Sequence, residues 1–215
     1  MKESSQFLRY LSPGLVFLFE FVVLWSLAQG FPETSAEATK GMSASLLLAA
    51  VLVFATGIGY LLSSFHHLLY WNIYPQFLIL DYRPLLAAVR SNGRLVLLSS
   101  WEDEMDPWNL SRAGQWRVVT SIWKGRRENS QRIKGADDRT DSLADLMHGA
   151  GTVFVGAVSA AVAVALICYV FDNPIPRWGF WPGSLLLISF HLINFVGLVA
   201  HARAQGHEHR KALQQ

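Results

Sequence analysis

Charge is scarce in this chain of 215 residues. Charged residues make up 16% of the sequence, whereas soluble domains average about 25%. The formal net charge of +2 does not by itself indicate a nucleic-acid partner. Cysteine is almost absent, and Cys168 alone excludes an intrachain disulfide. The sequence also has no internal repeat, P-loop, GxSxG or nucleotide-binding fingerprint, so no motif indicates a common enzyme class.

Long apolar runs are what the sequence does contain. The uncharged run 149–171, GAGTVFVGAVSAAVAVALICYVF, is long enough to cross a hydrocarbon core of about 30 Å as a helix. Backbone groups in lipid must bond to one another, which favours a helix over other structures. Similar runs at about 13–30, 43–64 and 180–200 predict three further spans. The sequence therefore predicts an all-α integral membrane protein with four transmembrane helices in a lipid bilayer.

The predicted spans divide the chain into two helix pairs and a polar insert. Residues 1–71 form the first pair, and its second helix is expected to extend to about residue 71. Residues 145–202 form the second pair, and residues 203–215 are a polar tail. The insert, 72–144, lies between the second and third spans and is predicted to be mainly helical.

The distribution of basic residues predicts the orientation. Sixteen of the 18 lysines and arginines lie before the first span, in the insert or in the tail. The positive-inside rule then places both termini and the insert in the cytoplasm, on one side of an inner or plasma membrane. A basic start followed by an apolar run also suggests a signal peptide. Glu20 interrupts that run, so we expect an uncleaved first span.

Polar side chains inside two spans are the first candidate site. Glu20 lies near the middle of the first span, and His191 lies near the middle of the fourth, with Asn194 one turn further on. An ionisable group in the membrane is unfavourable by a few kcal/mol unless it is paired or neutralised. A hydrogen bond or ion pair between Glu20 and His191 would serve either as a structural clamp between two spans or as part of a proton or ion path.

Histidines and aspartates near the predicted cytoplasmic face are the second candidate site. Such side chains bind divalent metals when they converge, and a metal site there suits an enzyme acting on a lipid-like substrate. Histidines are also common at membrane interfaces, and an aspartate near a helix start suits the helix dipole. No HExxH, HxxxH or CxxC pattern is present. The candidate residues are His66, His67, His148, His201, Asp141 and Asp145.

Haem b is a further possible cofactor. Two histidines on different spans are able to ligate iron axially, as His67 and His201 would, or His191 with another partner. Single histidines on apolar helices are more often simply packed. This hypothesis corresponds to an electron carrier.

Small residues follow the third span. They allow close approach of helix backbones, either within one chain or between subunits of a homo-oligomer. The residues concerned are Gly151, Gly156, Ser159, Ala160 and Ala163.

The insert is rich in tryptophan and basic residues. These side chains suit a surface that docks a cytoplasmic protein or anionic lipid, or a solvated face that pairs with the acidic turn at 102–106. They are Trp101, Trp108, Trp116, Trp123, Lys124, Arg126, Arg127, Arg132 and Lys134.

Three hypotheses on function follow. The first is a non-enzymatic protein that oligomerises, whose insert docks or senses a partner and whose spans act as anchor, pore or channel. The second is the metal-dependent membrane enzyme, and the third is the haem-binding electron carrier.

Overall fold

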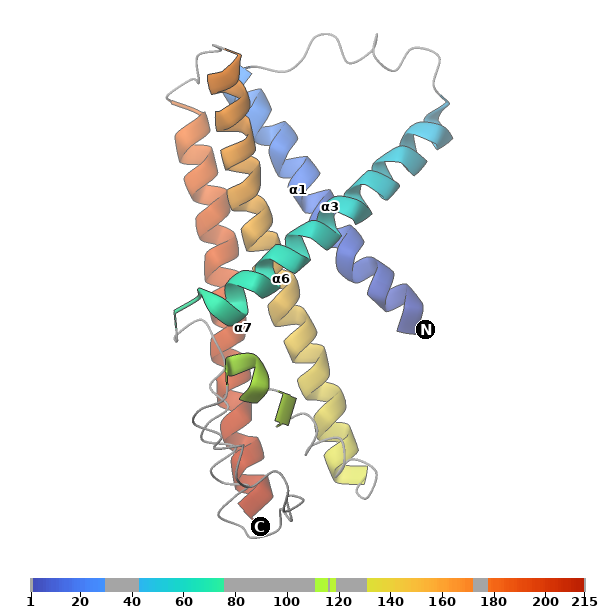
Figure 1. The fold of residues 1–215 in the computed structure, drawn as a ribbon, viewed down its shortest axis with the longest axis vertical. Coiled ribbons are helices and arrows are strands. Elements are labelled where there is room, and N and C mark those ends of the chain that lie inside the picture. The colour runs from blue at the N-terminus through green and yellow to red at the C-terminus, as the bar shows by residue number, and fades with distance from the viewer. Residues whose placement is uncertain are drawn as a thin grey trace. The chain divides into compact units, whose positions relative to one another are not determined.

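A computed structural model describes residues 2–29, 43–75, 111–115, 117–118, 131–171 and 178–214, and the side chains of residues 10–29, 43–75, 111–115, 117–118, 142–171 and 178–204. Four long helices make up nearly all of this part of the chain, which contains no strand (Figure 1). They are α1 (Lys2–Gln29), α3 (Ala44–Asn72), α6 (Gln131–Val170) and α7 (Phe180–Gln214).

Each of these helices contains a segment long and apolar enough to cross a membrane. The segments are Tyr10–Gln29, Ala44–Asn72, Ser142–Val170 and Phe180–Ala204. For the residues described, the all-helical fold with four membrane-length helices is thereby confirmed. The cytoplasmic position of the insert stays a prediction, and its residues 76–110 and 119–130 lie outside the described part.

The helices extend beyond the predicted spans. α1 begins at Lys2 and contains Pro13, where the apolar run begins. α6 begins at Gln131, well before the predicted span that starts at about residue 149, and α7 continues to Gln214 in the polar tail. An apolar run marks only the part of a helix that suits lipid. Polar residues with good helix propensity, such as glutamine, arginine and lysine, continue the same helix outside it.

The chain divides into two compact units. The first comprises Met1–Leu68 and His148–Phe195 and therefore holds α1 with the apolar parts of α3, α6 and α7. The second comprises Leu69–Met147 and Val196–Gln215. The first unit holds Glu20, His191, His66, His67 and His148.

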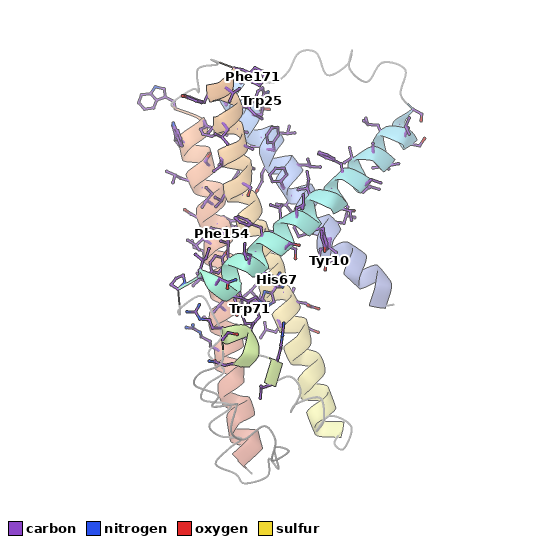
Figure 2. All side chains as sticks on the ribbon, in the orientation of Figure 1. Tyr10, Trp25, His67, Trp71, Phe154 and Phe171 are labelled. Atoms are coloured by element: carbon purple, nitrogen blue, oxygen red, sulfur yellow. The ribbon has the colours of Figure 1, made fainter. Side chains whose placement is uncertain are left out.

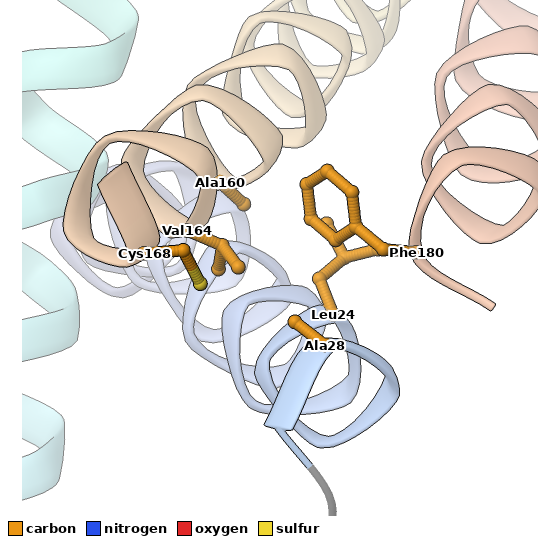
Figure 3. Packing of buried hydrophobic residues seen from close by; sticks show 6 residues of the cluster. All are labelled: Leu24, Ala28, Ala160, Val164, Cys168 and Phe180. Carbon is orange, nitrogen blue, oxygen red and sulfur yellow. The ribbon is translucent and has the colours of Figure 1, made fainter. Parts of the chain in front are cut away.

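An apolar cluster joins three helices of the first unit. Figure 3 shows Phe180 of α7 directed at Leu24 of α1 and at the small side chains of α6. Gln29 Nε2 also donates a hydrogen bond to Cys168 Sγ over 3.3 Å. Because alanine and valine are small, the helices approach closely and leave these side chains almost wholly buried. The cluster consists of Leu24, Ala28, Ala160, Val164, Cys168 and Phe180.

α1 and α3 cross with their backbones in contact (Figure 1). A Cβ built on Gly14 would lie 1.7 Å from the carbonyl oxygen of Ala55, and a Cβ on Gly59 would lie 1.7 Å from that of Tyr10. The Tyr10 and Tyr60 rings meet edge to face at this crossing, with centroids 5.5 Å apart, and Figure 2 labels Tyr10. The crossing therefore requires glycine at both positions.

Large apolar side chains cover the outer faces of the helices. Phe19, Val53, Leu61 and Ile193 are between 68% and 75% exposed. Such a surface would be unfavourable in water, and it is what a multi-pass membrane protein presents to lipid tails.

Aromatic rings gather where α3 ends, in the second unit. Tyr70 is fully buried and meets both Trp71 and Tyr74 edge to face. Arg112 donates a hydrogen bond of 3.1 Å to the carbonyl oxygen of Tyr74, which joins residues 38 positions apart in the sequence. This contact fixes the chain just beyond the apolar segment.

Burial raises the pKa of Tyr74 to about 12, against about 10 for an ordinary tyrosine. Because the folded state disfavours the charged tyrosinate, this group leaves folding stability unchanged below a pH of about 10 and lowers it as the pH rises towards about 12. We expect tyrosinate absorbance to include a late step from Tyr74, which follows the ionisation of the exposed tyrosines. That late step should be missing in Tyr74→Phe, and an unchanged titration curve in this variant would contradict the assignment.

Candidate functional site

Glu20 and His191 form a buried polar contact between α1 and α7. Glu20 Oε1 lies 2.5 Å from His191 Nε2, with the two side chains 3% and 13% exposed. At this distance the two groups share one hydrogen bond, whichever of them carries the proton. The surrounding helices are apolar, so the contact offsets much of the unfavourable burial of each group.

The second carboxyl oxygen of Glu20 takes no part in the contact with His191. Glu20 Oε2 is buried, and no hydrogen-bond partner for it occurs in the described residues. Buried polar oxygens are nearly always hydrogen-bonded, and one left over in a native site calls for an explanation such as a catalytic role or a water molecule. Asn194 is exposed on α7, so the buried contact consists of Glu20 and His191.

Three histidines come together where α3 meets α6. His66 is fully buried, and its Nε2 lies 3.2 Å from His148 Nδ1. The His67 ring stacks on the His148 ring, with centroids 4.7 Å apart and an interplanar angle of 22°. His67 Nδ1 lies 2.8 Å from the carbonyl oxygen of Ser63. Since a carbonyl only accepts, His67 carries a proton on Nδ1, and in its neutral form Nε2 is the acceptor nitrogen.

Gly151 determines where the His66 ring lies. A Cβ on Gly151 would be 2.1 Å from His66 Cε1 and 2.7 Å from Nε2. Only a residue without a side chain lets the imidazole lie directly on the α6 backbone, one turn from His148. The close approach therefore serves the histidine contact as well as helix packing.

Phe195 of α7 packs against the histidine cluster. Its ring is fully buried and meets the His66 ring edge to face at 5.6 Å. It also stacks on Phe154 of α6 at 6.5 Å and 10°. Phe195 follows His191 by four residues, so both lie on one face of α7 about 6 Å apart along its axis. In Figure 2, His67 and Phe154 mark the place where α3 passes α6.

The predicted metal ligands are only partly brought together. Besides the three clustered histidines, Asp145 and His201 are exposed residues of the second unit, and the side chain of Asp141 lies outside the described part. No group of three or more histidine, cysteine, aspartate or glutamate side chains among those described is arranged to hold a metal ion. His191 Nε2, a predicted haem ligand, faces Glu20 instead of an open space. Metal and haem binding stay predictions.

The small residues of the third span contribute to packing inside the chain. Gly151 lies against His66, and a Cβ on Gly156 would touch Leu62 at 3.4 Å. Ala160 belongs to the buried apolar cluster, whereas Ser159 and Ala163 are half-buried. These contacts explain the small residues within one protomer, and the homo-oligomer stays a prediction.

The predicted docking surface lies outside the described side chains. Arg132 and Lys134 belong to α6, but only their backbone is described. The other residues fall in undescribed segments: Trp101, Trp108, Trp116, Trp123, Lys124, Arg126 and Arg127.

Sequence reasoning did not single out Phe195 or the role of Gly151 beside His66. The available signal was the spacing of four residues from His191 to Phe195, which places both on one helix face. Comparisons with protein-family models, curated proteins and solved structures find no match to this chain. The geometry of the bundle is therefore the basis for a function.

Proposed function

We propose that this multi-pass membrane protein passes protons through its helix bundle, and that Glu20 and His191 are the proton-carrying pair. The observation that carries the proposal is their contact of 2.5 Å in the bundle interior, with Glu20 Oε2 buried and lacking a partner among the described residues. Ionisable groups inside a membrane typically mark ion pathways and proton relays. Carboxylate and imidazole are also the side chains that most readily exchange protons in proteins.

The close packing of the bundle favours the proton over other ions. Glycines bring the backbones of α1 and α3 into contact at Gly14 and Gly59, and Gly151 lets the His66 side chain of α3 lie on α6. Metal cations need a ring of several oxygen ligands or a water-filled lumen. A proton needs only a series of hydrogen-bonding groups that donate and accept in turn. One copy of the chain suffices for such a route.

The transfer at this site involves no covalent intermediate. His191 accepts a proton on Nδ1 and releases the proton on Nε2 to Glu20 Oε1, so the imidazole is neutral before and after the step. The protonated carboxyl then rotates about its Cγ–Cδ bond, so that its O–H takes the position of Oε2, and it passes the proton to a water molecule. The imidazole returns to its Nε2–H tautomer by exchanging protons with water and then donates the next proton to the resulting carboxylate. The unpartnered oxygen is thus the exit from the pair.

A purely structural clamp would use the same contact, so a measurement of proton flux is needed to distinguish a clamp from a proton route. The full chain in liposomes, with a pH dye inside and a potassium diffusion potential as driving force, should acidify faster than empty liposomes. Glu20→Gln keeps the size and hydrogen bonding of the side chain but cannot ionise. We expect it to reduce the rate by about a hundredfold, as for loss of a positioned proton-transfer group.

The control for this experiment is Ile193→Ala, a change at a residue that is 72% exposed two positions from His191. It should conduct like the wild type. No flux above empty liposomes, or an unchanged rate in Glu20→Gln, would leave the contact as a clamp and overturn the proposal.

The proposal also includes two predictions, that the chain self-assembles and that it docks a partner. Oligomerisation would place several such bundles side by side, and residues 72–144 would dock a cytoplasmic protein. Subunit counting in bilayers tests the first, and a strictly monomeric protein would rule it out without affecting conduction through each chain.

A further inference from the structure

We infer that His66 and His148 form a second proton-holding site on the same route, with Phe195 as the apolar gate between this site and Glu20–His191. The inference rests on the proposed proton conduction and adds a second site and a gate to it. Four observations carry it: the 3.2 Å contact of two ring nitrogens, the buried position of His66, the space that Gly151 provides, and the place of Phe195.

The two imidazoles are arranged to share a proton. His66 Nε2 and His148 Nδ1 face each other at 3.2 Å, so one nitrogen donates and the other accepts. When one ring gains a proton on its outer nitrogen, the proton between the rings moves across, and the second ring releases one from its own outer nitrogen. Both rings are neutral before and after this exchange, and one proton has passed.

The surrounding titratable groups continue the route in one direction. His67 of α3 stacks on His148 and is only half-buried. Its Nδ1 bonds to the Ser63 carbonyl, which makes Nε2 the nitrogen that accepts. From α7, Phe195 meets His66 edge to face, and its ring cannot carry a proton. His67 therefore suits the outer end of the pair, and Phe195 closes the inner end.

Gly151 is the residue that makes this pair possible. An alanine at this position would place a methyl group 2.1 Å from His66 Cε1, so the ring would have to move away from α6 and from His148. Gly149, two residues earlier on the same helix, has nothing within 4 Å of a built Cβ. Gly149→Ala and Gly151→Ala are therefore the same substitution on one helix, and only the second displaces the His66 ring.

Two neighbouring rings, those of His66 and Phe154, hold Phe195 in the position of a gate. Its ring lies edge-on to His66 and is held flat against Phe154, while His191 is one turn away on the same helix. Apolar constrictions in channels stop conduction by excluding water. A proton crosses from one pair to the other only when the ring moves and water enters.

The test uses the full chain in the liposome flux assay. We expect His66→Gln, His148→Gln and Gly151→Ala each to lower the proton flux at least about tenfold, with Gly149→Ala at the wild-type rate. Phe195→Ala should raise the flux, and adding Glu20→Gln to it should abolish the increase. Retention of helical circular dichroism and of a single size-exclusion peak shows that each variant has folded.

The outcomes separate the two proposals. Flux that depends on Glu20 but is unchanged in His66→Gln and His148→Gln overturns the second site and leaves the proposed function standing. A lower flux in Phe195→Ala overturns the gate. No flux in the wild type overturns both. Nitrogen-15 NMR of labelled histidines gives an independent readout, because the shared proton shifts the signals of His66 and His148, and Gly151→Ala should remove that shift while Gly149→Ala preserves it.

Discussion

Gly59→Ala is expected to destabilise the folded protein by about 2 kcal/mol or more, whereas Gly57→Ala, two residues away, should be neutral or stabilising by up to about 1 kcal/mol. The added methyl group at position 59 would lie 1.7 Å from the Tyr10 carbonyl oxygen and 3.1 Å from the Gly14 nitrogen. These are backbone atoms, so no side-chain rotation relieves the overlap and α1 must move away from α3. At position 57 there is nothing within 4 Å, and alanine simply favours the helix.

The reciprocal change at the same crossing should have a similar effect. Gly14→Ala would place its Cβ 1.7 Å from the Ala55 carbonyl oxygen. Reversible unfolding in mixed micelles, with increasing denaturing detergent, measures all three variants. Equal stability of Gly57→Ala and Gly59→Ala would show that α1 and α3 do not cross as described.

Replacing both Glu20 and His191 by alanine should lower stability by less than the sum of the losses from the two single replacements. Glu20→Ala leaves the His191 imidazole buried without its acceptor, and His191→Ala leaves the carboxyl without its donor. Each change is expected to lower stability by about 1–3 kcal/mol. The coupling energy of a polar contact between membrane helices averages about 0.6 kcal/mol and reaches about 1.7 kcal/mol. The short, buried contact should lie at the upper end of that range.

The same unfolding assay measures this double-mutant cycle. A cycle on Glu20 and the exposed Asn194 is the control and should show no coupling. If the Glu20–His191 coupling were zero, the two side chains would not be in contact in the folded protein, and both the clamp and the proton route would lose their structural basis.

The four membrane-length helices of the described part were predictable because apolar runs of this length are typical of transmembrane helices. The ends of the helices were not. The charged residues after position 131 and after position 201 are good helix formers, and composition alone does not say whether a helix continues through them. The first apolar run opens at Pro13, but α1 starts eleven residues earlier, at Lys2.

The candidate site was partly visible in the sequence. Glu20 and His191 stood out because an ionisable residue is conspicuous inside an apolar run. His66 and His148 were grouped by their depth alone, and depth does not determine which way a side chain points. Whether Gly57 or Gly59 contacts another helix depends on which face of α3 meets α1. Helix packing decides such questions, and it joins residues far apart in the sequence.

If the bundle conducts protons by this route, Glu20 must take up and release a proton during conduction. Infrared difference spectroscopy on the full chain in liposomes detects this directly, because a protonated carboxyl has a carbonyl band that a carboxylate lacks. A step in external pH should produce a carboxyl band that follows the proton flux in the wild type and in Ile193→Ala, and that is missing in Glu20→Gln. Conduction by the wild type without any band that Glu20→Gln removes would show that protons cross elsewhere.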